Sequence, residues 1–281
     1  MNLPPPPPPP TCPRHPQREA FRACTRCGRA WCNDCLVQAS VGSQCVECLK
    51  QSRPPAAERL RRWNATRSMP VTRALVALNV AVFLYLAVRD TGALAGGRIT
   101  RAQYDLGLAR QLVAQGDWWR MITSGFIHFG VIHLAFNMLA LWNLGALLEP
   151  LLGTRRYLLL YSASLMTGAA GVLLLTTRFT ITGGASGAIF GLFGAAAVAL
   201  RQHGINPFRT NIGTVLLINL VLTFSIRGIS IGGHLGGLAG GAICGLVLTS
   251  PRWKQVPVAL EWAVPLGLIA LSFVVGIAIS G

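Results

Sequence analysis

Long apolar runs separated by short polar segments make up the chain from Val71 onward, whereas the residues before Val71 are mostly polar. Most of these runs approach the ~20 residues that a helix needs to cross a bilayer. We therefore expect seven membrane-spanning helices in an all-α polytopic membrane protein. The runs lie near residues 71–88, 131–148, 157–176, 187–200, 211–226, 229–249 and 257–279.

Composition supports a membrane protein, and charge indicates its orientation. The chain is 52% hydrophobic and 12% charged, and most of its 31 glycines lie inside the apolar runs, as in closely packed membrane helices. Part of the net charge of +16 comes from Arg59, Arg61 and Arg62, before the first run. Since Lys and Arg collect on the cytoplasmic side, we expect a multi-pass protein of the cell membrane with a cytoplasmic N-terminus.

The same basic charge bears on the partners of the protein. Arginines beside a membrane helix contact lipid headgroups, so the lipid bilayer is the partner that we expect. Nucleic acid is the alternative for a basic chain. We expect no nucleic-acid partner, because much of the excess charge lies before the first apolar run and Lys and Arg collect on the cytoplasmic side of membrane helices.

Four pairs of potential zinc ligands lie within 37 residues near the N-terminus. The pairs are Cys12 with His15, Cys24 with Cys27, Cys32 with Cys35, and Cys45 with Cys48. Structural zinc takes four thiolate or imidazole ligands, and a two-residue gap lets both members of a pair bind one ion. Eight ligands predict two structural zinc ions, which would supply much of the folding free energy of so short a segment. Disulfides are the alternative, and a reducing compartment disfavours them.

Sequence spacing leaves the pairing of these ligands open. If the first and third pairs share one ion and the second and fourth share the other, the arrangement resembles a B-box-type zinc finger. We favour a regulatory or partner-binding role for this domain in the cytosol over a purely structural one.

A serine and a histidine stand at the starts of two apolar runs. Ser186 directly precedes the fourth run, and His234 lies near the start of the sixth. Polar and ionisable side chains are costly at membrane depth, so this pair indicates a functional site. The fourth run, residues 187–200, gives only ~21 Å of helix against a core of ~30 Å. We therefore expect Ser186 to cap a helix end that lies below the headgroups and still meets water.

Glycines on both runs would let the two helices approach closely. Gly237 and Gly241 follow His234 by three and seven positions and form one smooth face. The fourth run offers a matching face through Gly187, Gly191 and Gly194. Runs that begin on the same side of the membrane place Ser186 and His234 at similar depth. A hydrogen bond from the serine to the histidine is then geometrically reasonable, which predicts a nucleophile and its general base.

The predicted pair has no evident acidic partner, so packing must orient the imidazole. Phe190 lies one helical turn after Ser186, where it could stack against His234. Attack on an amide also needs donors for the oxyanion. His133 and Asn137, spaced i and i+4 on the second run, are candidates together with the Ser186 backbone N–H. The alternative for the second-run pair is that the two residues only hold helices together.

These residues together resemble the rhomboid intramembrane serine proteases over about residues 70–249. Gly184, Ser186 and Gly187 resemble the family's Gly-x-Ser-Gly nucleophile motif, and His234 with Gly237 and Gly241 resembles its base motif. His133 and Asn137 resemble the His-x-x-x-Asn of the oxyanion site. Trp119 with Arg120 is similar to the Trp-Arg pair of the first loop, and Glu149 with Gly153 and Arg155 to a structural element after the second helix. Phe190 departs from the family, which usually has tyrosine there.

The resemblance implies an intramembrane serine endopeptidase that cleaves membrane-anchored substrates in or near their transmembrane segments. It also implies a Ser186–His234 dyad near the outer face, no catalytic cofactor, and lateral substrate access beside the fifth helix. One alternative is a catalytically inactive rhomboid-like binding protein or chaperone. Another is a transporter in which histidines line a polar path, but no membrane-centre carboxylates suit a proton or cation relay.

The resemblance and the composition together divide the chain into five parts. We expect a rhomboid-like six-helix bundle with a seventh C-terminal transmembrane helix, and a small N-terminal zinc-binding domain. The parts are a proline-rich disordered arm (1–10), the zinc-binding domain (11–50), a basic linker (51–69), the six-helix protease core (70–250) and the additional helix (251–281).

Overall fold

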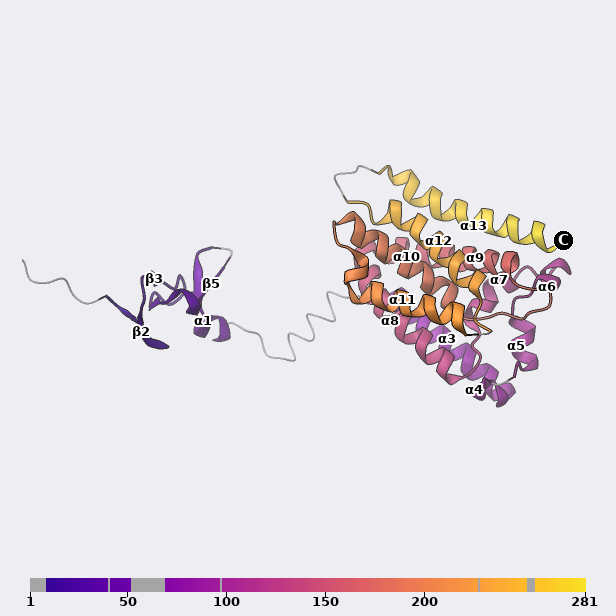
Figure 1. Cartoon of the computed structure of the whole chain (residues 1–281), viewed down its shortest axis with the longest axis horizontal. Helices are drawn as coiled ribbons and strands as arrows, with labels where there is room; N and C mark the ends of the chain where they lie inside the picture. The colour runs from indigo at the N-terminus through magenta and orange to yellow at the C-terminus, as the bar shows by residue number, and fades with distance from the viewer. Residues whose placement is uncertain (1–8, 40, 52–68, 97, 227, 252–255) are drawn as a thin grey trace, which may run out of the picture. The chain divides into compact units, whose positions relative to one another are not determined.

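The chain divides into two compact units, Met1–Thr66 and Arg67–Gly281 (Figure 1). The computed structural model describes residues 9–39, 41–51, 69–96, 98–226, 228–251 and 256–281. Residues 1–8 of the predicted arm and residues 52–68 of the predicted linker lie outside the described residues.

In its described residues, the first unit contains three two-stranded antiparallel hairpins, a 3-10 turn and one short helix. Strand β1 pairs with β2, β3 with β4, and β5 with β6. The elements are β1 (Thr11–Cys12), β2 (His15–Glu19), β3 (Arg22–Ala23), β4 (Ala30–Trp31), η1 (Asn33–Cys35), β5 (Leu36–Gln38), β6 (Ser43–Cys45) and α1 (Val46–Gln51). Its core holds Trp31 and Ala20 beside six buried cysteines. So small an apolar core is typical of a domain that bound metal stabilises.

The part of the second unit that the structure describes contains seven apolar helices, one for each predicted run. They are α3 (Pro70–Arg89), α8 (Val131–Leu152), α9 (Thr154–Leu175), α10 (Ser186–Gln202), α11 (Asn211–Ser225), α12 (Ile231–Leu248) and α13 (Val258–Ser280). All but α10 and α11 are long and apolar enough to cross a membrane. The expected all-α polytopic fold is confirmed.

Helix α10 differs in two ways from the sequence-based expectation. It has 17 residues rather than 14, or ~26 Å of helix, which is still less than the ~30 Å hydrocarbon core. Ala185 is the N-cap residue and Ser186 is the first residue of the helix. No side chain caps this end, so the expected capping by Ser186 is wrong and its hydroxyl is available for another partner.

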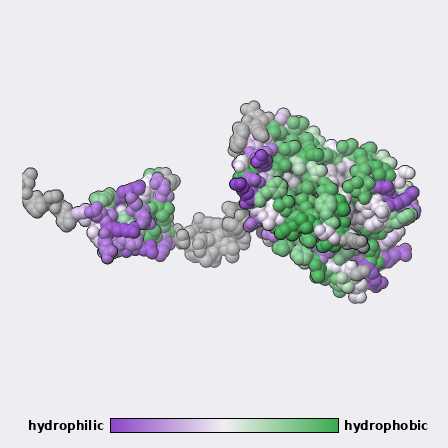
Figure 2. Space-filling view, viewed as in Figure 1, coloured by the Kyte–Doolittle hydropathy of each residue, from purple (hydrophilic) through white to green (hydrophobic). Residues whose placement is uncertain are grey.

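Helices α9, α10 and α12 pack against one another at the centre of the second unit (Figure 1). In α9, 67% of the membrane-spanning window is buried, compared with 28% in α3 and 22% in α13. Glycines allow the close approach: a Cβ on Gly171 of α9 would lie 2.2 Å from the Gly232 carbonyl oxygen of α12. Figure 2 shows a broad apolar surface on the second unit with polar residues toward its two ends, as expected where lipid surrounds the helices.

Four short helices and a 3-10 turn occupy the segment between α3 and α8, which the apolar pattern did not predict. They are α4 (Gly92–Ala95), α5 (Arg101–Leu106), α6 (Arg110–Ala114), α7 (Arg120–Thr123) and η2 (Ser124–Phe126). Buried Arg120 holds this segment together, because its guanidinium donates to Asp117 and to the carbonyl oxygens of Tyr104 and Gly107 at 2.7–3.0 Å.

The seventh helix, α13, packs mainly along α9 and also contacts α12 and the short helix α6. An ion pair of 2.5 Å between Arg156 and Glu261 joins the first turns of α9 and α13. Toward the other end of α13, Phe273 makes an edge contact with Trp118, with ring centroids 5.7 Å apart. Helix α13 therefore supports the α9 side of the bundle. Elsewhere in this unit, the short 3-10 helix η3 (Pro207–Arg209) precedes α11.

Candidate active site and metal centres

The structure brings Ser186 and His234 into direct contact. Their side chains come from the first turns of α10 and α12, and Ser186 Oγ lies 2.9 Å from His234 Nε2. His234 is 8% exposed. A hydroxyl at hydrogen-bond distance from a ring nitrogen in a sheltered place is the arrangement that activates a serine nucleophile.

Two neighbours hold the His234 ring in its orientation. The Phe190 ring stacks on it, with centroids 4.0 Å apart and an interplanar angle of 15°. The Thr223 hydroxyl oxygen lies 2.7 Å from Nδ1, the ring nitrogen that faces away from Ser186. The stacking of Phe190 agrees with the expectation from the sequence. The contact of Thr223 was not expected, because one threonine in an apolar run gives no sign of what it contacts.

Glycines set the close approach of α10 and α12. A Cβ on Gly237 would lie 1.9 Å from the Gly187 carbonyl oxygen, and one on Gly241 would lie 2.0 Å from that of Gly191. Distances of this kind exclude any larger residue unless the helices separate. The glycine pattern read from the sequence therefore lies at the helix contact that joins Ser186 to His234.

His133 lies beside the serine and presents a donor there. Its Nδ1 accepts a hydrogen bond of 3.3 Å from the Phe129 backbone N–H, so the neutral ring carries its proton on Nε2. A Cβ built on Gly184, whose φ is +134°, would lie 3.0 Å from His133 Nε2 and 3.6 Å from Ser186 Oγ. The glycine thus leaves open the space between the His133 donor and the Ser186 hydroxyl.

Asn137 lies one turn after His133 on α8 and is 7% exposed. Its side-chain Nδ2 donates to the His133 carbonyl oxygen at 2.8 Å, which leaves its second N–H for another acceptor. The Ser186 N–H belongs to the first turn of α10, where backbone N–H groups have no acceptor within the helix. These three donors lie on two helices in contact, α8 and α10.

Two further buried polar residues lie toward opposite ends of α8, His128 beside the site and Glu149 away from it. The fully buried His128 ring makes an edge contact with His133, with centroids 5.1 Å apart. Buried Glu149 accepts from the backbone N–H groups of Val71 and Thr72 and from the Thr72 hydroxyl at 2.7–2.8 Å. This carboxylate fixes the start of α3 against the end of α8.

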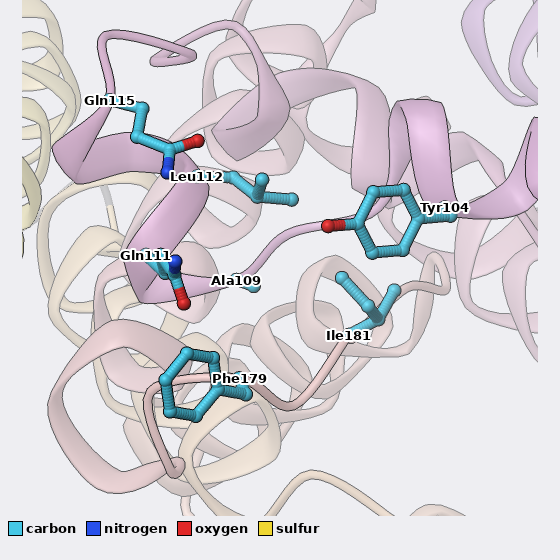
Figure 3. A pocket seen from close by; sticks show the side chains of 7 residues that line it. All are labelled: Tyr104, Ala109, Gln111, Leu112, Gln115, Phe179 and Ile181. Atoms are coloured by element: carbon cyan, nitrogen blue, oxygen red, sulfur yellow. The ribbon is translucent and has the colours of Figure 1, made fainter.

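Two cavities lie at the surface of the described residues, and neither is lined by Ser186 or His234. One of about 100 Å³ is lined by residues of α5, α6 and the segment after α9, and Figure 3 shows the Tyr104 hydroxyl directed into it. The other, of about 250 Å³, is lined by Thr176, Thr177 and the residues around Ser230. The second lies directly before the turn of α12 that carries His234.

The eight cysteine and histidine ligands form two groups of four. One contains Cys12, His15, Cys32 and Cys35, and the other contains Cys24, Cys27, Cys45 and Cys48, with all ligand atoms of a group within 4.8 Å of one another. The first and third pairs therefore lie together, as do the second and fourth. Within the described residues each pair lies at a hairpin turn, at η1 or at the start of α1.

The distances within each group suit zinc. With Zn–S of about 2.3 Å and Zn–N of about 2.0 Å, tetrahedral geometry separates two sulfurs by about 3.8 Å and a nitrogen from a sulfur by about 3.5 Å. His15 Nδ1 lies 3.4 and 3.5 Å from the sulfurs of Cys32 and Cys35, and those of Cys27 and Cys45 are 3.9 Å apart.

Backbone hydrogen bonds also favour the metal-binding form of one thiol. Burial opposes ionisation of Cys24, but N–H groups of Cys45 and Arg26 donate to its sulfur at 3.2 and 3.4 Å. The net result lowers the pKa of Cys24 to about 6. Because a thiolate is the zinc ligand, this environment suits a bound ion.

Comparison with known proteins agrees with this geometry. A family model described as the Rhomboid domain matches residues 115–251. The rhomboid protease GluP of Bacillus subtilis is 35% identical over 206 residues, which are 72% of this chain and 39% of GluP. The rhomboid protein YdcA of Bacillus subtilis is 34% identical over 192 residues, 67% of this chain and 94% of YdcA. This chain belongs to the rhomboid family.

The rhomboid match includes the whole candidate active site. Ser186, His234, His133 and Asn137 all lie within residues 115–251, while α13 and the cysteine-rich unit lie outside. RHOMBOID-like protein 4 of Arabidopsis thaliana is also similar, 31% identical over 197 residues, 61% of this chain. This rhomboid spans 39% of GluP and 48% of the Arabidopsis protein.

Proposed function

We propose that this rhomboid is an intramembrane serine endopeptidase with Ser186 as nucleophile and His234 as general base. The observation that carries the proposal is the 2.9 Å contact between Ser186 Oγ and His234 Nε2, made by two helices of a membrane-spanning bundle. Its membership of a family with named proteases supports the same reaction.

The proposed reaction moves one proton through His234 Nε2 in each of its two halves, acylation and deacylation. His234 Nε2 takes the hydroxyl proton as Ser186 Oγ bonds to the carbonyl carbon of the substrate amide. The tetrahedral intermediate then collapses: the C–N bond breaks and the Nε2 proton passes to the departing amine. His234 then takes a proton from water, whose oxygen bonds to the acyl carbon. The bond from that carbon to Oγ breaks, the Nε2 proton passes to Oγ, and the carboxylic acid product leaves.

Negative charge on the intermediate needs donors that are already in place. We assign this role to the Nε2–H of His133, the free N–H of Asn137 and the backbone N–H of Ser186. The hydrogen bond from Phe129 to His133 Nδ1 supports the first assignment, because it leaves the proton of His133 on Nε2. Removing one such donor costs about 10²–10³-fold in kcat in serine proteases.

The substrate class follows from the location of the dyad. Its helices are surrounded by apolar, lipid-facing surface, so a membrane-anchored protein is the substrate that can reach it (Figure 2). A substrate helix must unwind to expose an amide, which Gly or Pro near the cut makes easier. An odd number of spans precedes each of the helices α8, α10 and α12. If the N-terminus is cytoplasmic, the starts of these three helices therefore lie toward the outer face.

Cleavage of a single-span reporter in proteoliposomes tests the proposal. The wild type should cut it, whereas Ser186→Ala and His234→Ala should each be inactive yet inserted normally. Ser162→Ala on α9 and His203→Ala after α10 are the matched controls, and both should keep activity. Cleavage by either dyad variant would refute the assignment.

We also infer that the cysteine-rich unit binds two structural zinc ions, one with a Cys₃His set and one with a Cys₄ set. Ligand spacing close to tetrahedral values supports this inference. Interleaved pairs of this kind resemble a B-box finger, and the role that we propose is binding of a regulatory partner in the cytosol. The zinc ions take no part in peptide hydrolysis.

A further inference from the structure

Thr223 is a buried residue on a helix that is mostly exposed. It is 1% exposed, whereas Val221 and Phe224 are 63% and 61% exposed on the same helix, α11. The other buried residues of α11 are Gly213 and Leu216. The hydroxyl of Thr223 therefore lies on the inner face of α11, where it meets His234.

The single hydroxyl hydrogen of Thr223 determines which group donates in the hydrogen bond between Thr223 and His234. The Thr223 hydroxyl has one hydrogen, and its oxygen lies 2.6 Å from the Asn219 carbonyl oxygen one turn earlier. Two oxygens this close need a hydrogen between them, so the hydroxyl donates to Asn219. Its lone pairs must then face His234 Nδ1 at 2.7 Å, and the ring nitrogen must be the donor.

A proton on Nδ1 decides which nitrogen faces the serine. A neutral imidazole carries one proton, so Nε2 is left without one and can accept the Ser186 hydroxyl at 2.9 Å. With the opposite tautomer, Nε2–H would point at the hydroxyl and could not remove its proton. The chain from His234 through Thr223 to Asn219 thus selects the form of the ring that a general base needs.

We propose that Thr223 is a positioning residue that fixes the tautomer and the orientation of His234. The inference rests on the proposed serine protease function. When His234 takes the serine proton, both ring nitrogens donate, and Thr223 keeps accepting from Nδ1–H while its own hydroxyl stays on Asn219. In a Ser-His-Asp triad, the acidic residue accepts a hydrogen bond from the histidine Nδ1–H and so fixes the tautomer and orientation of the ring. Here the Thr223 hydroxyl, which donates to the Asn219 carbonyl, takes this role.

Steady-state kinetics on a fluorogenic transmembrane peptide in proteoliposomes test the inference. Thr223→Val keeps the shape of the side chain and removes the hydroxyl, and we expect kcat to fall roughly 10- to 100-fold, as for loss of one hydrogen bond to a charged group. KM should stay within about twofold, because Thr223 acts through His234. Thr223→Ser keeps the hydroxyl and should retain most of the wild-type kcat.

Thr214→Val is the matched control. Thr214 lies on α11 and its hydroxyl makes the same bond to the carbonyl four residues earlier, at 3.2 Å, but it is exposed and far along the helix. This variant should have wild-type kcat. Wild-type kcat in Thr223→Val, or equal losses in Thr223→Val and Thr223→Ser, would overturn the inference.

The design separates this inference from the proposed function. If Thr223→Val does not fold, Thr223→Ala and Thr223→Ser carry the same comparison, since they differ only by the hydroxyl. If the wild type is active, Ser186→Ala is inactive and Thr223→Val keeps wild-type activity, only the positioning role of Thr223 is refuted. If the wild-type protein cleaves no reporter, the proposed protease function itself is refuted.

Discussion

Gly237→Ala tests whether the glycine contact between α10 and α12 sets the catalytic distance. Gly237 lies three residues after His234, and a Cβ there would be 1.9 Å from the Gly187 carbonyl oxygen. An ordinary carbon–oxygen contact is about 3.3 Å. The two helices would therefore have to separate by about 1.4 Å at a point one turn from the dyad.

This separation should reach the reacting atoms. Ser186 starts α10 and His234 lies in the first turn of α12, so their 2.9 Å bond would lengthen to roughly 4 Å, which is no longer a hydrogen bond. A misplacement of about 1 Å can cost about 10²-fold in rate. We expect kcat/KM to fall about 100-fold, with overpacking lowering the free energy of unfolding by about 1–3 kcal/mol.

Cleavage rates and thermal unfolding of purified protein would measure both effects. Gly267→Ala on α13 is the control, because a Cβ at that position meets nothing within 4 Å. It should keep full activity and gain up to about 1 kcal/mol from better helix propensity. If folded Gly237→Ala retains more than a third of wild-type kcat/KM, the close helix contact does not set the dyad distance.

Three further predictions test the surroundings of the dyad and the metal sites. Phe190→Leu removes the ring stacked on His234 and should lower kcat about 10-fold, whereas Phe190→Tyr should keep it; equal rates would contradict the stacking role. His133→Ala should lower kcat about 10²-fold with little change in reporter KM, and a pure KM effect would exclude an oxyanion role. Replacing Cys24 and Cys27 by serine should reduce bound zinc, measured by mass spectrometry of the metal, from two ions per chain to one. Full retention of two ions would disprove the Cys₄ site.

The helical fold could be predicted because membrane helices are apolar over their whole length. A run of apolar residues marks each of the seven helices to within a few residues, since the bilayer leaves the backbone no other partner. The short helices between α3 and α8 could not be predicted this way. They depend on long-range contacts of polar groups, above all the buried Arg120, which joins parts of the chain 13 and 16 residues apart.

The candidate site was predictable where its residue types are costly in a membrane. Ser186, His234 and His133 stand out from apolar surroundings, and the glycine spacing indicates which helices approach. Thr223 carries no such mark, because a threonine can satisfy its hydroxyl on its own helix. Its contact with His234 depends on the rotation of α11, which the apolar pattern of that helix does not fix.

Labelling with a fluorophosphonate probe tests the central claim most directly, because the probe reacts only with an activated serine. The full-length protein in membranes should carry one adduct, which peptide mass spectrometry places on Ser186, and His234→Ala should abolish it. An unlabelled wild-type protein that is folded and inserted, or an adduct on another serine, would contradict the account.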